Sequence, residues 1–161
     1  DCLLSRGLGD VYKRQIKDFM GVEHRIEYVR DKNGVRYYND SKGTNPDSSI
    51  KALEAMSRPT ILIAGGYDKH SEFDEFIEAF DNKVKLMVLL GQTADKIEET
   101  AVRHGFTNII KTDSLEKAVK ICAENAVSGD VVLLSPACAS WGMFKNYEER
   151  GKLFKEYVNS L

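Results

Sequence analysis

The 161-residue chain has three cysteines, three prolines and one tryptophan, and it has no long apolar run. Cys2, Cys122 and Cys138 are too few and too scattered for a disulfide framework or a zinc site, so we expect free thiols in a reducing cytoplasm. No run approaches the roughly 18 apolar residues that a membrane-spanning helix needs. The first residues also lack the apolar segment of a signal peptide. We therefore expect a cytoplasmic protein with no role in a membrane.

The chain also lacks an excess of either charge. Lysine and arginine together number 23 and aspartate and glutamate 25, which gives a formal net charge of -2. This balance does not favour a general role in binding nucleic acid or a membrane surface, although it is compatible with a local basic site. Apolar residues make up 42% of the chain, which is typical of a globular domain with a real core.

Several motifs that mark common sites are missing. The chain has no GxxxxGK[ST] loop to cradle nucleotide phosphates and no GxGxxG dinucleotide fingerprint. HExxH, CxxC and GxSxG are absent as well, and we expect no metal site.

The N-terminal segment differs from the rest of the chain. Residues 1–15 show no helical or strand period and resemble the read-through of a cloning or sequencing adapter, so they are left out of the fold prediction. The protein proper is then expected to begin near Ile16, with a short helical turn or linker over Ile16–Met20 that ends at Gly21.

An antiparallel pair of strands is predicted next. Apolar and polar residues alternate over residues 24–29, and a second strand follows over residues 35–38. Asp31–Gly34 between them is a strong hairpin turn signal. In the predicted first strand, Ile26 and Tyr28 point toward the core.

The remaining chain alternates short apolar strands with amphipathic helices. This pattern is typical of a parallel sheet covered by helices on both faces, so we predict an α/β, Rossmann-like, doubly wound domain with the antiparallel hairpin on its N-terminal side. The predicted strands are 60–64, 84–90, 108–111 and 131–134, and the predicted helices are 47–56, 73–80, 93–104, 114–126 and 146–161.

The first candidate site is the segment Asn39–Pro46, which follows a strand. Asn45 is a good helix N-cap and Pro46 suits the first helical position. The helix after them would direct its amino end at a group of polar side chains, and such an end favours an anion. A simple capped turn explains the same residues equally well. The polar side chains of the group are Asp40, Lys42 and Thr44.

The second candidate site is Gly65–His70, after the apolar strand 60–64. Two glycines allow close backbone approach at a strand end. Lys69 would offer a compact cation to a carboxylate or phosphate. His70 is more consistent with a surface histidine than with a general base.

The third candidate site is Ser135–Ser140, after the strand 131–134. Its small residues can expose successive backbone N–H groups, and together with the Ser140 hydroxyl they suit a carboxylate. Cys138 reads as a small buried residue rather than a nucleophile, because no histidine or acid stands at a helpful spacing. The aromatic residues that follow are more consistent with docking the last helix than with walling a pocket; they are Trp141, Phe144 and Tyr147.

Taken together, these segments resemble the carboxy-terminal domain of the Mur ligase family, over about residues 16–161. In this resemblance the UDP-binding and central ATPase domains of the family are absent from the chain. The residues that carry the resemblance are His24-Arg25, Asn39–Asn45, the Gly65-Gly66-x-x-Lys69 turn, Leu133–Ser140, and Phe144–Tyr147 with Arg150-Gly151.

The resemblance implies an ATP-dependent amide ligase of bacterial peptidoglycan synthesis. ATP would phosphorylate the carboxylate of UDP-N-acetylmuramoyl-L-alanine, and D-glutamate would attack the acyl phosphate. ATP and Mg²⁺ would be bound mainly by the absent central domain, so the chain alone is expected to be an inactive, monomeric fragment. Two other hypotheses for the function stay open: a different ligase of the Mur or folylpolyglutamate type, and a stand-alone doubly wound binding module.

The resemblance also assigns residues to the two substrates. Arg25, Asp40 and Lys42 would face the nucleotide, with Asp40 accepting from a ribose hydroxyl. Thr44 and Lys69 would hold the α-carboxylate of D-glutamate. Ser140 and the backbone near Tyr147 would hold its side-chain carboxylate.

Overall fold

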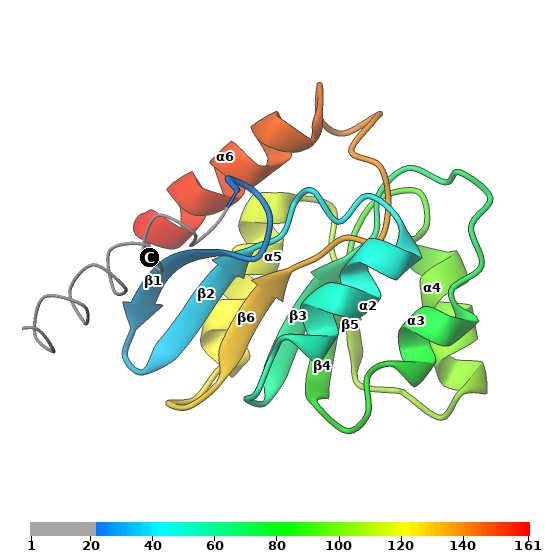
Figure 1. Cartoon of the computed structure of the whole chain (residues 1–161), viewed down its shortest axis with the longest axis horizontal. Helices are drawn as coiled ribbons and strands as arrows, with labels where there is room; N and C mark the ends of the chain where they lie inside the picture. Colours follow the sequence, from blue (N-terminus) through cyan, green and yellow to red (C-terminus); the bar gives the residue numbers. More distant parts are fainter. Residues whose placement is uncertain (1–21) are drawn as a thin grey trace, which may run out of the picture.

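A computed structural model describes residues 22–161, so the predicted adapter segment 1–15 and the turn over Ile16–Met20 lie outside the described residues. Within that part of the chain, one sheet of six strands has the order β1-β2-β6-β3-β4-β5 (Figure 1). Only the pair β1–β2 is antiparallel, and all other neighbours are parallel. The strands are β1 (Glu27–Lys32), β2 (Val35–Asn39), β3 (Thr60–Ala64), β4 (Val84–Leu89), β5 (Ile109–Lys111) and β6 (Val131–Leu134).

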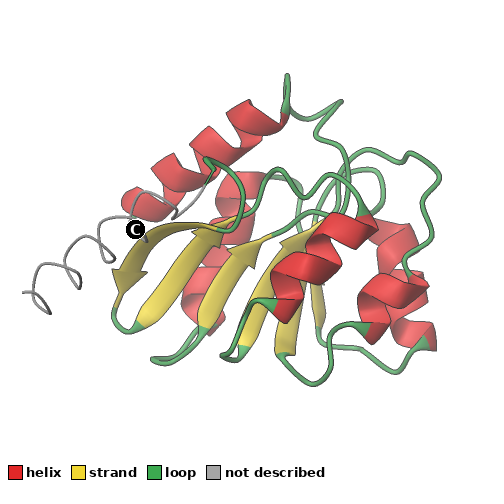
Figure 2. Cartoon of the chain, in the orientation of Figure 1, coloured by secondary structure: helices red, strands yellow, loops and turns green. Residues whose placement is uncertain are grey.

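Helices cover both faces of this sheet (Figure 2). One face carries α2, α3 and α4, and the opposite face carries α5 and α6. Three of the helices begin at a side-chain cap, in which Asn45, Ser114 or Asn146 accepts a hydrogen bond from a backbone N–H of the first turn. The helices are α2 (Pro46–Glu54), α3 (Asp74–Glu78), α4 (Ala94–Arg103), α5 (Leu115–Asn125) and α6 (Tyr147–Asn159).

The core lies in two layers, because side chains alternate between the faces of each strand. In β3, Leu62 and Ala64 pack under α2 to α4, whereas Ile61 and Ile63 pack under α5 and α6. All four side chains have no exposed surface. Burial on both faces explains why the central strands read as continuous apolar runs, and the predicted doubly wound fold is confirmed.

The predicted strand over residues 24–29 is wrong in its first residue and in the side chains that it directs toward the core. His24 and Ile26 have positive φ angles of 66° and 44°, so the strand begins only at Glu27. Tyr28 was expected to point inward, but 48% of it is exposed. The reason is that β1 is an edge strand whose α2-side face is covered by no helix of the described part, so Tyr28 packs only edge-on against Tyr38.

The hairpin turn itself is confirmed. Asn33 and Gly34 have φ angles of 55° and 80°, which is the left-handed pair that a two-residue type I′ turn requires. None of the helices in residues 22–161 is long and apolar enough to cross a membrane.

Candidate functional site

The three candidate segments follow β2, β3 and β6, and these strands are neighbours in the sheet. Since β2, β6 and β3 run parallel, their carboxyl ends meet at one edge, shown at the top of Figure 1. The chain leaves β2 toward α2 on one face and leaves β6 toward α6 on the other. This change of face is the topological switch point at which open α/β sheets bind ligands. We call the segments the β2 loop (39–45), the β3 loop (65–70) and the β6 loop (135–146).

A buried carboxylate holds the β2 loop against the β6 loop. Asp40 is 4% exposed, and its two oxygens accept from the Ile26 N–H at 3.1 Å and from the Ser135 hydroxyl at 2.7 Å. Ser135 also lies 2.8 Å from the Ser49 hydroxyl of α2. Burial raises the pKa of the Asp40 carboxyl to about 6, because desolvation outweighs these hydrogen bonds. Asp40 is therefore built into the frame of the site.

A buried guanidinium joins the same two loops from α6. Arg150 is 2% exposed and donates to the backbone oxygen of Ser41 at 2.7 Å and to that of Cys138 at 3.1 Å. It also donates to the Ser41 hydroxyl at 3.0 Å. Burial lowers the pKa of Arg150 to about 10, so its guanidinium stays charged near neutral pH. From the sequence, Arg150 was only part of a motif and had no predicted role.

The β3 loop approaches the β6 loop through backbone contacts. The Gly65 N–H donates to the Pro136 oxygen and the Tyr67 N–H to the Ala139 oxygen, both at 2.9 Å. A Cβ on Gly65 would lie 2.1 Å from the Leu90 oxygen, and its φ is +103°, so only glycine fits there. The glycine pair is therefore needed for close packing, and the three loops form one connected rim.

Three cations stand on or beside this rim. Arg25 and Lys69 are exposed, and Lys42 is half-buried. Within residues 22–161, twelve ion pairs join other lysine, arginine or histidine residues to carboxylates, but none includes Arg25, Lys42 or Lys69. Three cations without a carboxylate partner in the described part suit an anionic ligand.

The predicted amino-acid side of the site is less exposed. Thr44 and Tyr147 are half-buried, and Ser140 is 3% exposed at the end of the β6 loop. The backbone oxygen of Tyr147 accepts from the Ser41 hydroxyl at 2.7 Å, so the start of α6 is fixed to the β2 loop. The predicted residues thus share one edge of the sheet, with Thr44 beside α2 and Ser140 before α6.

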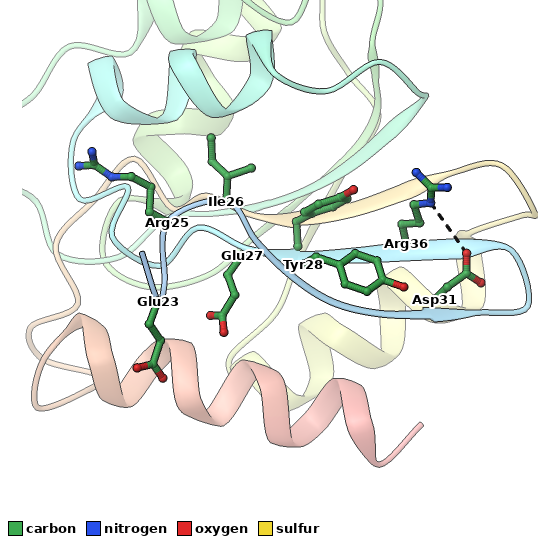
Figure 3. A pocket seen from close by; sticks show the side chains of 8 residues that line it. Glu23, Arg25, Ile26, Glu27, Tyr28, Asp31 and Arg36 are labelled. Carbon is green, nitrogen blue, oxygen red and sulfur yellow. Dashed lines mark ion pairs between the residues drawn. The ribbon is translucent and has the colours of Figure 1, made fainter. Parts of the chain in front are cut away.

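A hollow beside the first two strands contains only one of the predicted residues. A groove of about 980 Å³ lies along β1 and β2, and Arg25 stands at one end of it (Figure 3). Tyr28 and Arg36 project from the strands beside it, whereas Glu27 points toward α6. A second, narrow crevice of about 10 Å³ is lined by Ser140 together with Arg150. The two hollows do not bring the predicted residues into one pocket.

Two further predictions concern residues that were not assigned to the site. His70 is exposed, as expected for a surface histidine. Cys138 is 3% exposed, and burial raises the pKa of its thiol, so the prediction of a buried cysteine is confirmed. In residues 22–161 no group of three or more histidine, cysteine, aspartate or glutamate side chains could hold a metal ion.

This chain is similar in sequence to known ligases. The model of the family "Mur ligase, glutamate ligase domain" matches residues 24–138. The UDP-N-acetylmuramoylalanine–D-glutamate ligase of Lachnospira eligens is 65% identical over 152 residues, which are 94% of this chain and 34% of that protein. The enzyme of the same name from Thermoanaerobacter sp. (strain X514) is 58% identical over 154 residues, again 94% of this chain and 34% of that protein. The chain thus spans about a third of the length of these relatives.

Solved structures of related enzymes share the fold. The UDP-N-acetylmuramate-alanine ligase MurC of Thermotoga maritima superposes with a TM-score of 0.62 over 89% of this chain and 31% of that chain, at 15% identity. A bifunctional folylpolyglutamate synthase/dihydrofolate synthase of Yersinia pestis gives a TM-score of 0.61 over 84% of this chain and 31% of that chain, at 12% identity. At these identities the likeness concerns the fold alone.

Proposed function

Because the chain belongs to the Mur ligase family through its glutamate ligase domain, we propose that it is the part of an ATP-dependent ligase that receives D-glutamate. The acceptor would be UDP-N-acetylmuramoyl-L-alanine, and the place of action the bacterial cytoplasm. The sequence identity of 65% to an enzyme named for D-glutamate supports this amino acid over those of other Mur ligases.

One observation carries the proposal: the rim at the switch point presents cations that no carboxylate of the described part neutralises. D-Glutamate brings two carboxylates, and the rim offers a receptor for each. We assign the α-carboxylate to Lys69 and Thr44, and the side-chain carboxylate to Ser140 and the backbone N–H groups at the start of α6 near Tyr147. Two fixed carboxylates would orient the amine for attack, which is a gain in proximity.

The nucleotide would lie on the other side of the rim. Arg25 and Lys42 would neutralise phosphate charge there. The Lys42 N–H donates to the His24 oxygen at 3.0 Å, so the two segments are held side by side. This hydrogen bond supports binding of the same ligand by both cations. A bond from Asp40 to a ribose hydroxyl stays a prediction. Because internal donors already occupy both of its oxygens, we propose that Asp40 mainly holds the β2 loop in place.

The chain's own residues do not form a complete nucleotide site. No GxxxxGK[ST] segment is present, and residues 22–161 contain no cluster suited to Mg²⁺. When bound, the nucleotide supplies the activation of the acceptor carboxylate. We propose that the parts of the relatives that this chain does not span hold ATP and Mg²⁺, so that this chain alone turns over no substrate.

A chimera tests the proposed function. The matching C-terminal third of the Lachnospira eligens enzyme is replaced by residues 22–161 of this chain, and phosphate release is measured with each amino acid in turn. We expect turnover with D-glutamate, and none from this chain alone. Preference for another amino acid in a chimera that turns over would show a different ligase of this family.

A binding titration separates the assigned residues from the fold. D-Glutamate is titrated into the isolated chain by NMR, with L-glutamate as the stereochemical control. Lys69→Met and Ser140→Ala should weaken binding, whereas Lys152→Met, on the exposed side of α6, should not. Weak binding is expected because part of the site is missing. Tight binding of ATP or D-glutamate by the chain alone would instead favour a stand-alone binding module.

A further inference from the structure

An aromatic pair stands on the rim where the β3 and β6 loops meet. The rings of Tyr67 and Trp141 lie edge to face, with centroids 5.5 Å apart and an interplanar angle of 63°. Both are unusually open for large aromatic residues, with 40% of Tyr67 and 55% of Trp141 exposed. Trp141 was expected to dock α6 or to wall a pocket, and its exposure argues against the first of these roles.

The pair is fixed to the rim by the backbone. Tyr67 and Ala139 form an isolated antiparallel bridge, in which the Tyr67 N–H donates to the Ala139 oxygen at 2.9 Å. Ser140 follows Ala139 directly, and Trp141 follows Ser140. The same bridge therefore positions the aromatic pair and the serine that we assign to the side-chain carboxylate.

The aromatic pair also contacts the assigned lysine. The ammonium nitrogen of Lys69 lies over the Trp141 ring, 5.9 Å from its centroid, which is within cation–π range. Lysine has four rotatable bonds and strongly hydrated charge, so an exposed lysine samples many positions unless something holds it. Within residues 22–161 the indole face, rather than a carboxylate, is what holds this ammonium.

We propose that Trp141 is a positioning residue that holds the Lys69 ammonium at the entrance of the D-glutamate site, with Tyr67 fixing the plane of the indole. This inference rests on the proposed function, since it names how that site is prepared for its substrate. An aromatic face attracts the ammonium without neutralising it, whereas a carboxylate in the same place would compete with the incoming α-carboxylate. The cation is therefore ordered and still available to the ligand.

The first test needs no ligand. Ring current from Trp141 should shift the ε-CH₂ signals of Lys69 upfield in the NMR spectrum of the wild-type chain. Trp141→Leu should return them to ordinary lysine positions, and Trp141→Phe should keep part of the shift. Since Trp141 is more than half exposed, neither variant should unfold the chain, which circular dichroism would check. Ordinary Lys69 signals in the wild-type chain would overturn the proposal.

The second test measures D-glutamate affinity by NMR titration. An exposed cation–π contact changes an equilibrium about two- to fivefold, so Trp141→Leu should weaken binding by that factor and Trp141→Phe by less. In a Lys69→Met background Trp141→Leu should have no further effect, because no ammonium is left to position. A structural role of Trp141 would persist in that background.

The single tryptophan of the chain supplies an independent signal. Its fluorescence should change on addition of D-glutamate, because the carboxylate then reaches the ammonium held over the indole, and not with L-glutamate. Intact binding with no loss in Trp141→Leu would overturn this inference alone. Absent binding in the wild-type chain and in an inactive chimera would overturn the proposed function and this inference with it.

Discussion

The hydroxyl of Ser135 donates to the buried carboxylate of Asp40 at 2.7 Å, and so joins the carboxyl end of β6 to that of β2. These residues stand 95 positions apart in the chain. The bond lies where the chain leaves the two strands for opposite faces of the sheet, so it holds the two loops together at the switch point. Because the Asp40 carboxylate is buried, its ionisation lowers the free energy of unfolding of the domain.

Stability should depend on pH through Asp40. Its pKa is about 6 in the folded chain, against an ordinary value of 3.8. The folded state therefore holds the proton more tightly than the unfolded state, so the contribution of Asp40 to the unfolding free energy falls as pH rises from 4 to 6 and is constant outside that window. We expect Asp40→Asn to gain stability relative to the wild type across this window, by up to about 3 kcal/mol.

Urea unfolding at pH 4, 5, 6 and 7 measures this difference. The matched control is Asp81→Asn, at an exposed turn position with φ of 41°, where asparagine is as well suited as aspartate. The control should show no such gain. A wild-type minus Asp40→Asn difference that is flat from pH 4 to 7 would contradict the prediction.

Removal of the Ser135 hydroxyl should destabilise the chain more at pH 7.5 than at pH 4.5. In Ser135→Ala both Asp40 and Ser49 lose a buried partner, which costs about 1–3 kcal/mol. The loss is greater above pH 6, because the hydrogen bond is then made to a charged carboxylate. Urea unfolding at the two pH values checks this, with the exposed Ser128→Ala as control. Equal losses at both pH values would mean that the Asp40 charge plays no part.

The sequence predicted the fold well where burial is complete. The strands Thr60–Ala64 and Val131–Leu134 were predicted with their observed bounds, because a strand buried on both faces is a continuous apolar run. Tyr28 was misplaced because its apolar ring fits an inward position of an alternating strand, and local pattern cannot show that the face beyond an edge strand stays open. The insertion of β6 between β2 and β3 also depends on contacts that no local pattern contains.

The loops of the site were predicted, but the residues that hold them together were not. Lys42, Lys69 and Ser140 stand in segments whose small and turn-forming residues mark strand ends. Arg150 stands in a helix rich in charged residues, where nothing local distinguishes it from an exposed arginine. Its burial follows from contacts with Ser41, 109 positions away, and is visible only in three dimensions.

Arg150→Lys should destabilise the domain and weaken D-glutamate binding together. Lysine cannot donate to both the Ser41 and Cys138 oxygens, and each buried carbonyl left without a donor costs about 1–3 kcal/mol. The loops that carry Lys42 and Ser140 would then lose their common anchor. Arg103→Lys is the control, because the Arg103 side chain is 60% exposed and pairs only at the surface. Thermal unfolding and D-glutamate titration should both be unchanged in the control.

Gly151→Ala offers the sharpest contrast between local and tertiary effects. Gly151 lies inside α6, where alanine is favoured over glycine by about 0.8–1 kcal/mol. A Cβ there would lie 2.2 Å from Nδ1 of His24 and 3.0 Å from the Asn39 amide nitrogen, so we expect a net loss of about 1–3 kcal/mol from overpacking. The His24 ring, 5% exposed and held by Asn39 at 2.9 Å, has little room to move.

A double-mutant cycle with His24→Gly decides the cause of that loss. Glycine removes the ring and tolerates the φ of 66° at this position, so Gly151→Ala should become neutral or stabilising in the His24→Gly background. Urea unfolding of the four proteins gives the coupling energy directly. If Gly151→Ala costs the same in both backgrounds, the His24 contact is not responsible. If the cost vanishes, Gly151 is required because α6 must approach His24, the residue next to Arg25.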